Sequence, residues 1–381
     1  MRTRPREQQL RRFVWKFREE DEWQDFAFDR VHFGDCCAAC QLEVAKDLLA
    51  DTYSYIDPEA AQHVKDDVYV DDGVTGGTPE QVDRFLGVKT DDGSFNGTIS
   101  QILGGGNFKF KAAVRSGDTD EEQIAKLGNN VFGYYWNVTE DMLGVRFIVN
   151  LSKKKRGIRS EPNLNVDDIK KLGTVHLCKR NLLGFMNGFC NSLGIASPWY
   201  MKSKLMMQEL FLLEQPLSWD DPIPAGNRAA WISVMVEALE QGVLDFPRCT
   251  RPANAVGMGP RIVGFGDGAL PGFGGCVYTQ WEVDGDHEAG YEGEGGYEAN
   301  LLIAKARVCP LRGYTVPRSE LCGARVVSRL LLSVVTAMFK MEEAPIGVVM
   351  LLDTRCVISA LELTSTKLMP FFQNTQTFRK Y

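Results

Sequence analysis

The stretch Ile262-Val263-Gly264-Phe265-Gly266-Asp267 sets an ionisable side chain at the end of an apolar, Gly-rich run. Two more acidic residues stand in comparable places. Glu320 follows Pro317-Arg318-Ser319 at the start of a predicted helix, and Asp353 follows the apolar run 347–352. A carboxylate at the end of a buried strand is unfavourable unless water or a cation reaches it. The order strand Asp, helix Glu, strand Asp therefore predicts a shared, oxygen-rich site that suits Mg²⁺.

Each of these three residues also has an ordinary structural interpretation. Asp267 fits a Gly-rich turn, Glu320 fits an acid that stabilises a helix N-terminus, and Asp353 fits a helix N-cap. Taken singly, these interpretations are at least as good as the functional one. Only the order of the three residues along the chain favours a site.

A second candidate is the stretch Tyr69-Val70-Asp71-Asp72, which continues the β-forming run from Val68 and is followed by Gly73. Neighbouring carboxylates at the tip of a hairpin repel each other unless a cation lies between them, which makes both residues candidate metal ligands. Asp-Gly is also a common hairpin dipeptide, so a solvated turn is the alternative. Either interpretation predicts a hairpin here.

Composition and length indicate a soluble multidomain protein. The 381 residues, 44% of them apolar, correspond to roughly two or three domains. No apolar run reaches the roughly 18 residues that span a bilayer, and no secretory signal follows the basic N-terminus. We therefore expect a cytoplasmic protein with reduced cysteines, in which Cys36-Cys37-x-x-Cys40 is a weak zinc signal.

The net charge of −7 is concentrated in one segment. Residues 281–304 contain seven acidic residues and no Lys or Arg, so the rest of the chain is balanced. Local basic runs occur at 2–18 and 153–156. The overall charge therefore does not exclude a polyanionic partner. We expect 281–304 to be a solvated, acidic loop between two strands.

The apolar pattern predicts short strands and helices at first, then helices, then Gly-rich strands. The spacing predicts a helix over 38–52 and another that begins at Pro79 and ends before Gly104-Gly105-Gly106. These three glycines are interpreted as a turn, because a phosphate loop would end in Gly-Lys-Ser/Thr. Residues 108–111 alternate like a strand, and helical spacing recurs over 182–193 and 201–213.

Short motifs resemble, over nearly the whole chain, the polyprotein of Bel/Pao-type LTR retrotransposons, from the reverse transcriptase palm into the ribonuclease H. The order strand Asp, helix Glu, strand Asp, with a strand pair after the first Asp, is likewise the layout of a ribonuclease H-like domain. The stretches that carry the resemblance are Gln9-Leu10-Arg11-Arg12-Phe13-Val14-Trp15, Val31-His32-Phe33-Gly34, Tyr69-Val70-Asp71-Asp72, Phe132-Gly133-Tyr134-Tyr135-Trp136, Gly194-Ile195-Ala196-Ser197-Pro198, Trp219-Asp220-Asp221-Pro222, Ala304-Lys305-Ala306-Arg307-Val308 and Pro317-Arg318-Ser319-Glu320-Leu321.

The resemblance implies a mixed α+β and α/β multidomain fold. Its parts would be a partial reverse transcriptase fingers and palm region at 1–150, a mostly helical thumb or connection region at 151–255, and a truncated ribonuclease H-like domain at 256–381. The acidic loop 281–304 would lie within the last of these.

The resemblance also implies two sites that each bind two Mg²⁺ ions. In the palm, Asp71 would be the main ligand and Asp72 a supporting one, with 132–136 positioning the primer terminus. In the last domain Asp267, Glu320 and Asp353 would hold the ions for hydrolysis of RNA. The implied partners are an RNA template, an RNA–DNA hybrid and dNTPs, without a membrane; the oligomeric state stays open.

Two departures from the family bear on activity. Met1 begins after the strand that carries a further palm aspartate in the family, and Tyr381 comes before the last ribonuclease H ligand. We therefore expect a polyprotein fragment without polymerase activity. The alternative is a domesticated or decaying remnant that at most binds nucleic acid.

Overall fold

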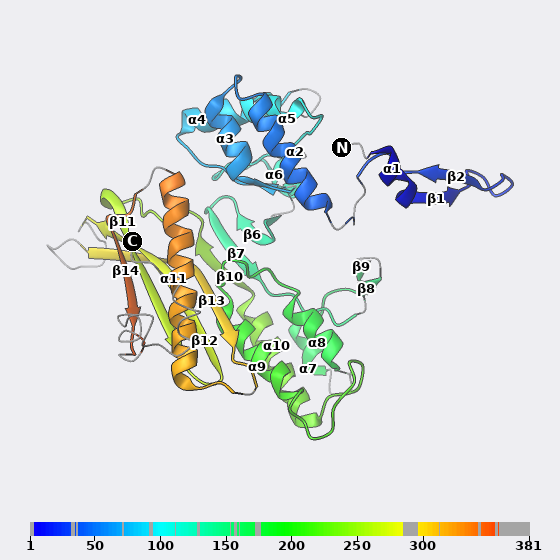
Figure 1. Cartoon of the computed structure of the whole chain (residues 1–381). Coiled ribbons are helices and arrows are strands. Elements are labelled where there is room, and N and C mark those ends of the chain that lie inside the picture. Colours follow the sequence, from blue (N-terminus) through cyan, green and yellow to red (C-terminus); the bar gives the residue numbers. More distant parts are fainter. Residues whose placement is uncertain are drawn as a thin grey trace, which may run out of the picture. The chain divides into compact units, whose positions relative to one another are not determined.

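The computed structural model describes residues 4–357, with internal gaps at 32–34, 36, 71, 91–93, 111, 128–129, 153, 156–157, 160, 172–176, 285–295, 312, 342–343 and 355–356. The chain forms two compact units, Met1–Phe132 and Gly133–Tyr381. Figure 1 shows their helices and strands along the chain. Each unit is described by itself.

The first unit combines short helices with two small β-hairpins. β1 pairs with β2 and β3 with β4, both antiparallel. Its elements are α1 (Pro5–Gln8), the 3-10 helix η1 (Gln9–Arg11), β1 (Arg12–Trp15), β2 (Gln24–Ala27), α2 (Ala38–Thr52), α3 (Pro58–Asp66), β3 (Val68–Tyr69), β4 (Asp72–Gly73), α4 (Pro79–Leu86), α5 (Thr98–Gly104), α6 (Glu121–Leu127) and β5 (Asn130–Val131).

The core of the first unit lies between α2, α3, α4 and α5. Val64, Phe85 and Ile102 are fully buried there. Asp57 caps α3 by accepting hydrogen bonds from the backbone N–H groups of the next turn, and Thr78 caps α4 in the same way. The predicted helix over 38–52 and the predicted helix start at Pro79 are confirmed.

Two predictions for the first unit are wrong. The helix predicted from Pro79 to the triple glycine is two helices, because α4 ends at Leu86, where Gly87 has a φ of 67°. Of the strand predicted over 108–111, residues 108–110 form no strand, and Lys111 lies outside the described residues. Phe110 instead packs against the core, which explains its apolar side chain.

The second unit contains helices α7 to α10 beside a small antiparallel sheet, followed by a larger sheet covered by α11. The small sheet contains β10, β7 and β6 in that order, and the larger sheet has the order β13-β12-β11-β14. The elements are β6 (Tyr134–Asn137), β7 (Met142–Arg146), β8 (Lys154–Lys155), β9 (Ile158–Arg159), α7 (Val166–Lys171), α8 (Lys179–Met186), α9 (Ser197–Glu209), α10 (Ala225–Gln241), β10 (Val243–Pro247), β11 (Ala255–Gly268), β12 (Gly272–Val283), β13 (Gly296–Val308), α11 (Val316–Lys340) and β14 (Gly347–Leu352).

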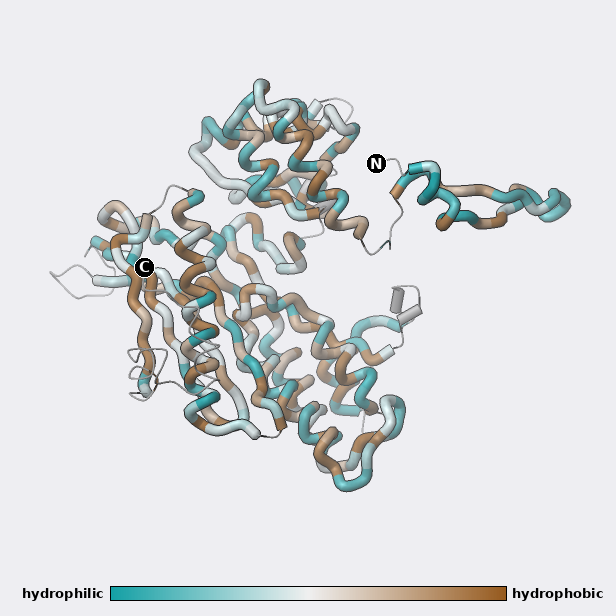
Figure 2. The backbone as a smooth tube through the Cα atoms, viewed as in Figure 1, coloured by the Kyte–Doolittle hydropathy of each residue, from teal (hydrophilic) through white to brown (hydrophobic). Residues whose placement is uncertain are grey.

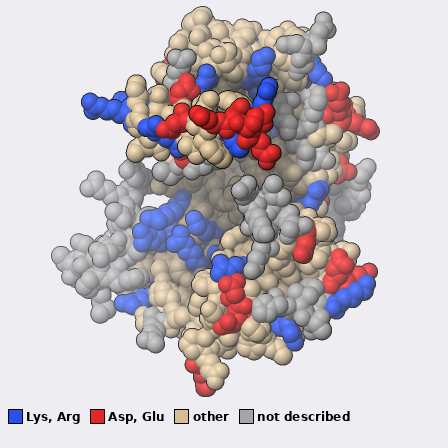
Figure 3. Space-filling model, turned by 90° about the vertical axis from the view of Figure 1, so that its right-hand side faces the viewer, with Lys and Arg blue, Asp and Glu red and all other residues tan. Residues whose placement is uncertain are grey.

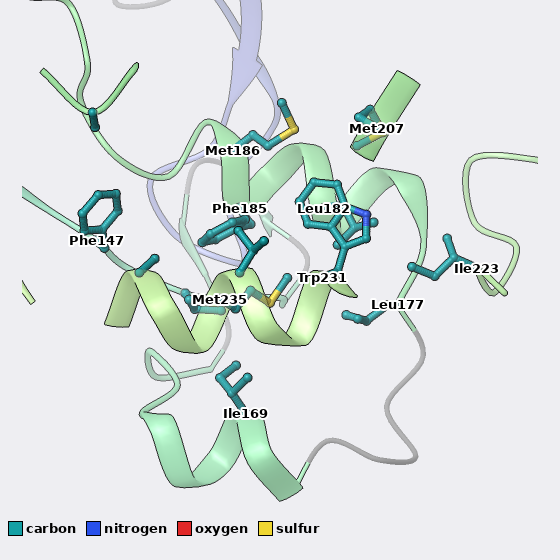
Figure 4. Close-up of a cluster of buried hydrophobic side chains, with 14 of the residues drawn as sticks. Phe147, Ile169, Leu177, Leu182, Phe185, Met186, Met207, Ile223, Trp231 and Met235 are labelled. Carbon is teal, nitrogen blue, oxygen red and sulfur yellow. The ribbon is translucent and has the colours of Figure 1, made fainter. Parts of the chain in front are cut away.

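A hydrophobic core holds the helices of the second unit together. Figure 4 shows Phe185 and Leu182 of α8 beside Trp231 and Met235 of α10, with Ile169 of α7 below them. The helical spacing seen over 182–193 and 201–213 extends past the real ends of these helices. α8 ends at Met186 and α9 at Glu209, because the apolar residues that follow pack onto the same core from loops.

The larger sheet is mostly antiparallel, with one parallel edge. β11 pairs antiparallel with β12, and β12 with β13, while β14 runs parallel to β11. Parallel neighbours need a long crossover connection, and here the chain between β11 and β14 forms β12, β13 and α11. A Cβ atom built on Gly264 would lie 2.7 Å from Val327 of α11, so glycine lets the helix pack closely on β11.

Helix α11 owes its apolar composition to this packing. Val327, Leu330 and Leu331 are buried against Ile262 and Val277 of the sheet. Among the described helices, α11 is long and apolar enough to cross a membrane by length and composition, a test that the core helix of a soluble protein also passes. Figure 2 shows that β14 is apolar along most of its length.

The acidic segment is shorter as a loop than predicted. β12 continues to Val283 and β13 begins at Gly296, so Glu282 and Glu298 lie on paired strands. Trp281 and Val283 are buried while Glu282 between them is exposed, the alternation of a half-buried strand. The prediction of a loop over 281–304 is therefore wrong at both ends, because acidic composition hid this alternation.

Charge is unevenly distributed on the surface as well as along the sequence. Figure 3 shows one group of Lys and Arg side chains away from acidic ones, while other Lys and Arg side chains on the drawn face lie beside Asp and Glu. The net charge of −7 therefore does not describe any single surface. Local patches of charge, rather than the net charge, determine where a charged partner would bind.

Candidate functional site

The three acidic residues singled out in the C-terminal third come together at one end of the larger sheet. Asp267 is the second-last residue of β11, and Asp353 directly follows β14. Because Gly266 pairs with Leu352 in a parallel register, both carboxylates leave neighbouring strands at the same end. Glu320, near the N-terminus of α11, lines the same recess as these two residues. The chain order thus corresponds to spatial convergence.

Glycines place Glu320 beside Asp267 by removing side chains from the contact between helix and strand. A Cβ atom on Gly268 would lie 2.2 Å from the backbone of Ser319, and one on Gly323 would lie 2.3 Å from the Asp267 carbonyl. Both contacts require glycine, because such approaches leave no room for a methyl group. The start of α11 therefore packs directly on the backbone that carries Asp267.

A buried serine ties the start of α11 to the turn after β11. Ser319 is fully buried, and its Oγ donates a hydrogen bond to the Ala269 carbonyl at 2.8 Å. Buried hydroxyls are costly unless they are hydrogen-bonded, so this bond stabilises one arrangement of helix and turn. No local pattern in the sequence indicates this role of Ser319.

The carboxylates differ in exposure and local bonding. Asp267 and Asp353 are exposed, whereas Glu320 is half-buried. One oxygen of Asp267 accepts a hydrogen bond from the Gly268 N–H at 2.6 Å, and one oxygen of Asp353 accepts from the Thr354 hydroxyl at 2.8 Å. Each aspartate has a second oxygen available as a ligand atom.

The donor set fits a hard divalent cation in its chemistry, because all three side chains offer carboxylate oxygens. The three side chains are, however, too far apart to bind one cation together as they stand. Within the described ranges, no group of three His, Cys, Asp or Glu side chains is arranged to hold a metal ion. The same finding covers Cys37 and Cys40, while Cys36 lies outside the described residues.

Next to the recess is an open cleft of about 790 Å³ that Asp267 and Asp353 also line. Small residues of β12 and β13 leave this space empty of side chains, among them Gly274 and Ala306, and Met201 of α9 lies at its side. Burial raises the pKa of the Cys276 thiol in its wall, which disfavours the nucleophilic thiolate. The cleft has no signal in the local sequence, because it depends on α9 packing beside strands that are distant along the chain.

In the first unit, the hairpin predicted for the second candidate is present in β3 and β4. Asp72 is described and accepts a hydrogen bond from the Phe132 N–H at 2.9 Å, whereas Asp71 lies outside the described residues. Val70 has a φ of 56°, which is unusual for a β-branched residue and marks strain at the tip. Its N–H donates to the Glu43 carboxylate at 2.7 Å, which helps to hold that conformation.

A buried lysine supports this hairpin from α2. Lys46 is 5% exposed and donates hydrogen bonds to the carbonyls of Lys65 at 2.8 Å and Val68 at 2.6 Å. It also forms an ion pair with Glu43 at 2.8 Å. Partial burial acts to raise the pKa of Glu43, but the bonds from Lys46 and Val70 outweigh it, so this pKa is below its ordinary value. The spacing Glu43-x-x-Lys46 was the available sequence signal.

The stretch 132–136 contributes mainly to the core of its region. Tyr134 and Trp136 are buried. The Tyr134 hydroxyl accepts from the Leu193 N–H at 2.6 Å, and Trp136 Nε1 donates to Asp141 at 3.1 Å. Their packing explains why aromatic residues occur here. A role in positioning a primer stays a prediction, and it would fall to the exposed side chain of Phe132.

Comparison with known protein families identifies one region. Residues 178–346, from the residue before α8 to the residue before β14, match the family model for the Pao retrotransposon-like RNaseH-like domain. The match supports a Pao-type retrotransposon ribonuclease H region, and the mixed α/β fold with several sheets is consistent with it. It contains Asp267 and Glu320 and ends before Asp353. No curated protein sequence matches the chain.

Proposed function

We propose that the second unit is a nucleic-acid-binding, ribonuclease H-like domain that hydrolyses the RNA strand of an RNA–DNA hybrid. The observation that carries the proposal is the recess shared by Asp267, Glu320 and Asp353, which come from a strand, a helix and a second, parallel strand. The family match over 178–346 supports a retrotransposon origin for this region.

In this proposal the three carboxylates hold the divalent cations, Mg²⁺ being the physiological choice. A bound cation would polarise a phosphate oxygen and lower the pKa of an attacking water. The chain's own contribution is to hold the carboxylates at one end of the sheet, with Glu320 kept close by the glycine contacts of α11. Contacts to the backbone of the nucleic acid should dominate binding, so affinity should fall steeply with salt.

The test is cleavage of a labelled RNA–DNA hybrid by the full chain with Mg²⁺. We expect Asp267→Asn to reduce the cleavage rate on the order of 100-fold or more, as for loss of other preorganised transition-state contacts. Glu282→Gln is the matched control, because Glu282 is an exposed acid on β12, far along the same sheet. Cleavage by Asp267→Asn at the unsubstituted rate would contradict the site assignment.

A second candidate function is binding without catalysis, as in a domesticated or decaying element. The observation that favours it is the open spacing of the carboxylates, which form no three-ligand group among the described residues. Hybrid binding that persists without any cleavage in Mg²⁺ or Mn²⁺ would support this second function and exclude the first.

We further propose that the first unit derives from a reverse transcriptase palm, with Asp71 and Asp72 as ligands of the Mg²⁺ that would bind a dNTP. The support is the β3–β4 hairpin, its strained Val70 and the buried Lys46 beneath it. Mg²⁺-dependent binding of a dNTP, measured by calorimetry, should be lost in Asp71→Asn. Binding that is unchanged in that variant would refute this assignment.

A further inference from the structure

One face of α9 lies along β13 and brings its side chains close to that strand. Gln208 of α9 donates a hydrogen bond to the Cys309 carbonyl at 2.9 Å. Just before α9, the Leu193 carbonyl accepts from the Ala304 N–H at 2.7 Å. Residues three or four apart share one helix face, so Lys204 lies on the face that carries Met201 and Gln208.

This contact gathers three cationic side chains. Lys204 is half-buried, while Lys305 and Arg307 are exposed. Lys305 and Arg307 are two residues apart on β13 and so point to the same side of the strand. Burial lowers the pKa of Lys204, and the nearby charges of Arg307 and Lys305 lower it further. The three positive charges therefore act on one another.

The charges of this cluster are not balanced by acids in the part of the chain that the structure describes. There, none of the three side chains forms an ion pair or a side-chain hydrogen bond; Lys204 instead lies over the Tyr200 ring, 4.2 Å from its centroid. Lys202, on the same helix, is paired with Glu237 at 2.7 Å. Unpaired like charges repel each other, and a bound anion would relieve that repulsion.

The cluster lies at the same end of the sheet as the carboxylates. In the strand register, Arg307 pairs with Phe273 of β12, which pairs with Gly268 of β11. Lys305 pairs with Gly275, which pairs with Gly266, so these two rows of residues define two levels along the strands. Asp267 falls between these two levels, two strands away, because it pairs with Gly274, which pairs with Ala306. Paired residues share a face of the sheet, so the Asp267 side chain leaves the face opposite to that of Lys305 and Arg307. At a strand spacing of about 4.8 Å, the backbones of β11 and β13 are roughly 10 Å apart. Lys305 and Asp267 also line the same cleft.

We propose that Lys204, Lys305 and Arg307 bind a backbone phosphate of the nucleic acid at the β13 edge of the sheet, at the same end as the carboxylates. The inference rests on the proposed function, since it concerns the same partner at a second point. The guanidinium of Arg307 can donate to two phosphate oxygens, and the lysines add charge without sequence preference. The site would position the strand rather than read its bases.

The test measures binding of a fluorescein-labelled RNA–DNA hybrid to the full chain in EDTA, over KCl from about 50 to about 200 mM. EDTA separates phosphate contacts from metal binding. The double variant K305Q/R307Q should bind roughly tenfold more weakly, and the slope of log affinity against log salt should become shallower by about 2. K202Q is the matched control, because Lys202 is already paired with Glu237, and it should bind as the unsubstituted chain does.

The outcomes separate this inference from the proposed function. Hybrid binding by the unsubstituted chain that K305Q/R307Q leaves unchanged would overturn the phosphate site and leave the ribonuclease proposal standing. Failure of the unsubstituted chain to bind any hybrid would overturn the proposed function itself. An equal loss in K202Q would show a general charge effect and also overturn the site. Both substituted residues are exposed, so the variants should fold, which circular dichroism would verify.

Discussion

The acidic recess of the second unit and the β3–β4 hairpin of the first unit both place carboxylates at the ends of strands, yet different contacts hold them. At the recess, the backbone of α11 lies directly on the backbone of β11 at Gly268 and Gly323. At the hairpin, the side chains of Glu43 and Lys46 reach up to a strained tip. The stability of the recess should therefore respond to added side-chain volume, and the stability of the hairpin to removal of a charge. Matched substitutions of each kind can distinguish these two types of support.

The largest expected effect is steric and concerns the recess. In Gly323→Ala the new Cβ would meet the Asp267 carbonyl at 2.3 Å, so α11 must move away from β11. We expect the free energy of unfolding to fall by about 3 kcal/mol, the upper range for overpacking. Urea unfolding measures it.

The control for that substitution is Gly226→Ala in α10, where an added Cβ has no atom within 4 Å. There the stability should stay unchanged or rise by about 0.5 kcal/mol, because alanine favours a helix more than glycine does. Equal losses in both variants would mean that close packing at Gly323 is not what holds the recess.

The next effect is electrostatic and concerns the hairpin. Lys46→Met removes the buried donor from two carbonyl groups and leaves Glu43 without its cation. The free energy of unfolding should fall by about 2 kcal/mol. Lys65→Met is the control, since Lys65 pairs with Asp51 at the surface and its loss should change little. A Lys46→Met chain as stable as the Lys65→Met chain would contradict a supporting role for Lys46.

The smallest effect is a pH dependence that the hairpin should show. The pKa of Glu43 is lower in the folded chain than its ordinary value near 4.5. Its contribution to stability is therefore complete above pH 4.5 and disappears as the pH falls through the folded pKa. In Glu43→Gln this acid-sensitive part, less than about 1 kcal/mol for a partly exposed group, should be missing. Urea midpoints measured from neutral to acidic pH would test it, and identical pH profiles would argue against the pairing.

The recess could be predicted from the sequence better than the contacts that support either site. An acid at the end of an apolar run is visible in residue order, and β11, α11 and β14 follow from local patterns. The close approach at Gly323, the cleft beside Met201 and the burial of Lys46 depend on which elements pack together, and tertiary packing is not a local property. The break between α4 and α5 was a local signal that the prediction overlooked, because Gly87 ends α4 with a positive φ.

The length of the β12–β13 hairpin has a consequence for how an acidic chain could accept a polyanion. Glu298 and Arg307 stand nine residues apart on β13, or roughly 30 Å at the rise of an extended strand. The Debye length in physiological salt is about 8 Å, so charges that far apart are screened from each other. The length of the hairpin thus separates its acidic residues from the end of the sheet where Asp267, Lys305 and Arg307 lie. Negative charge on the far part of its strands therefore does not repel an anionic partner bound at that end.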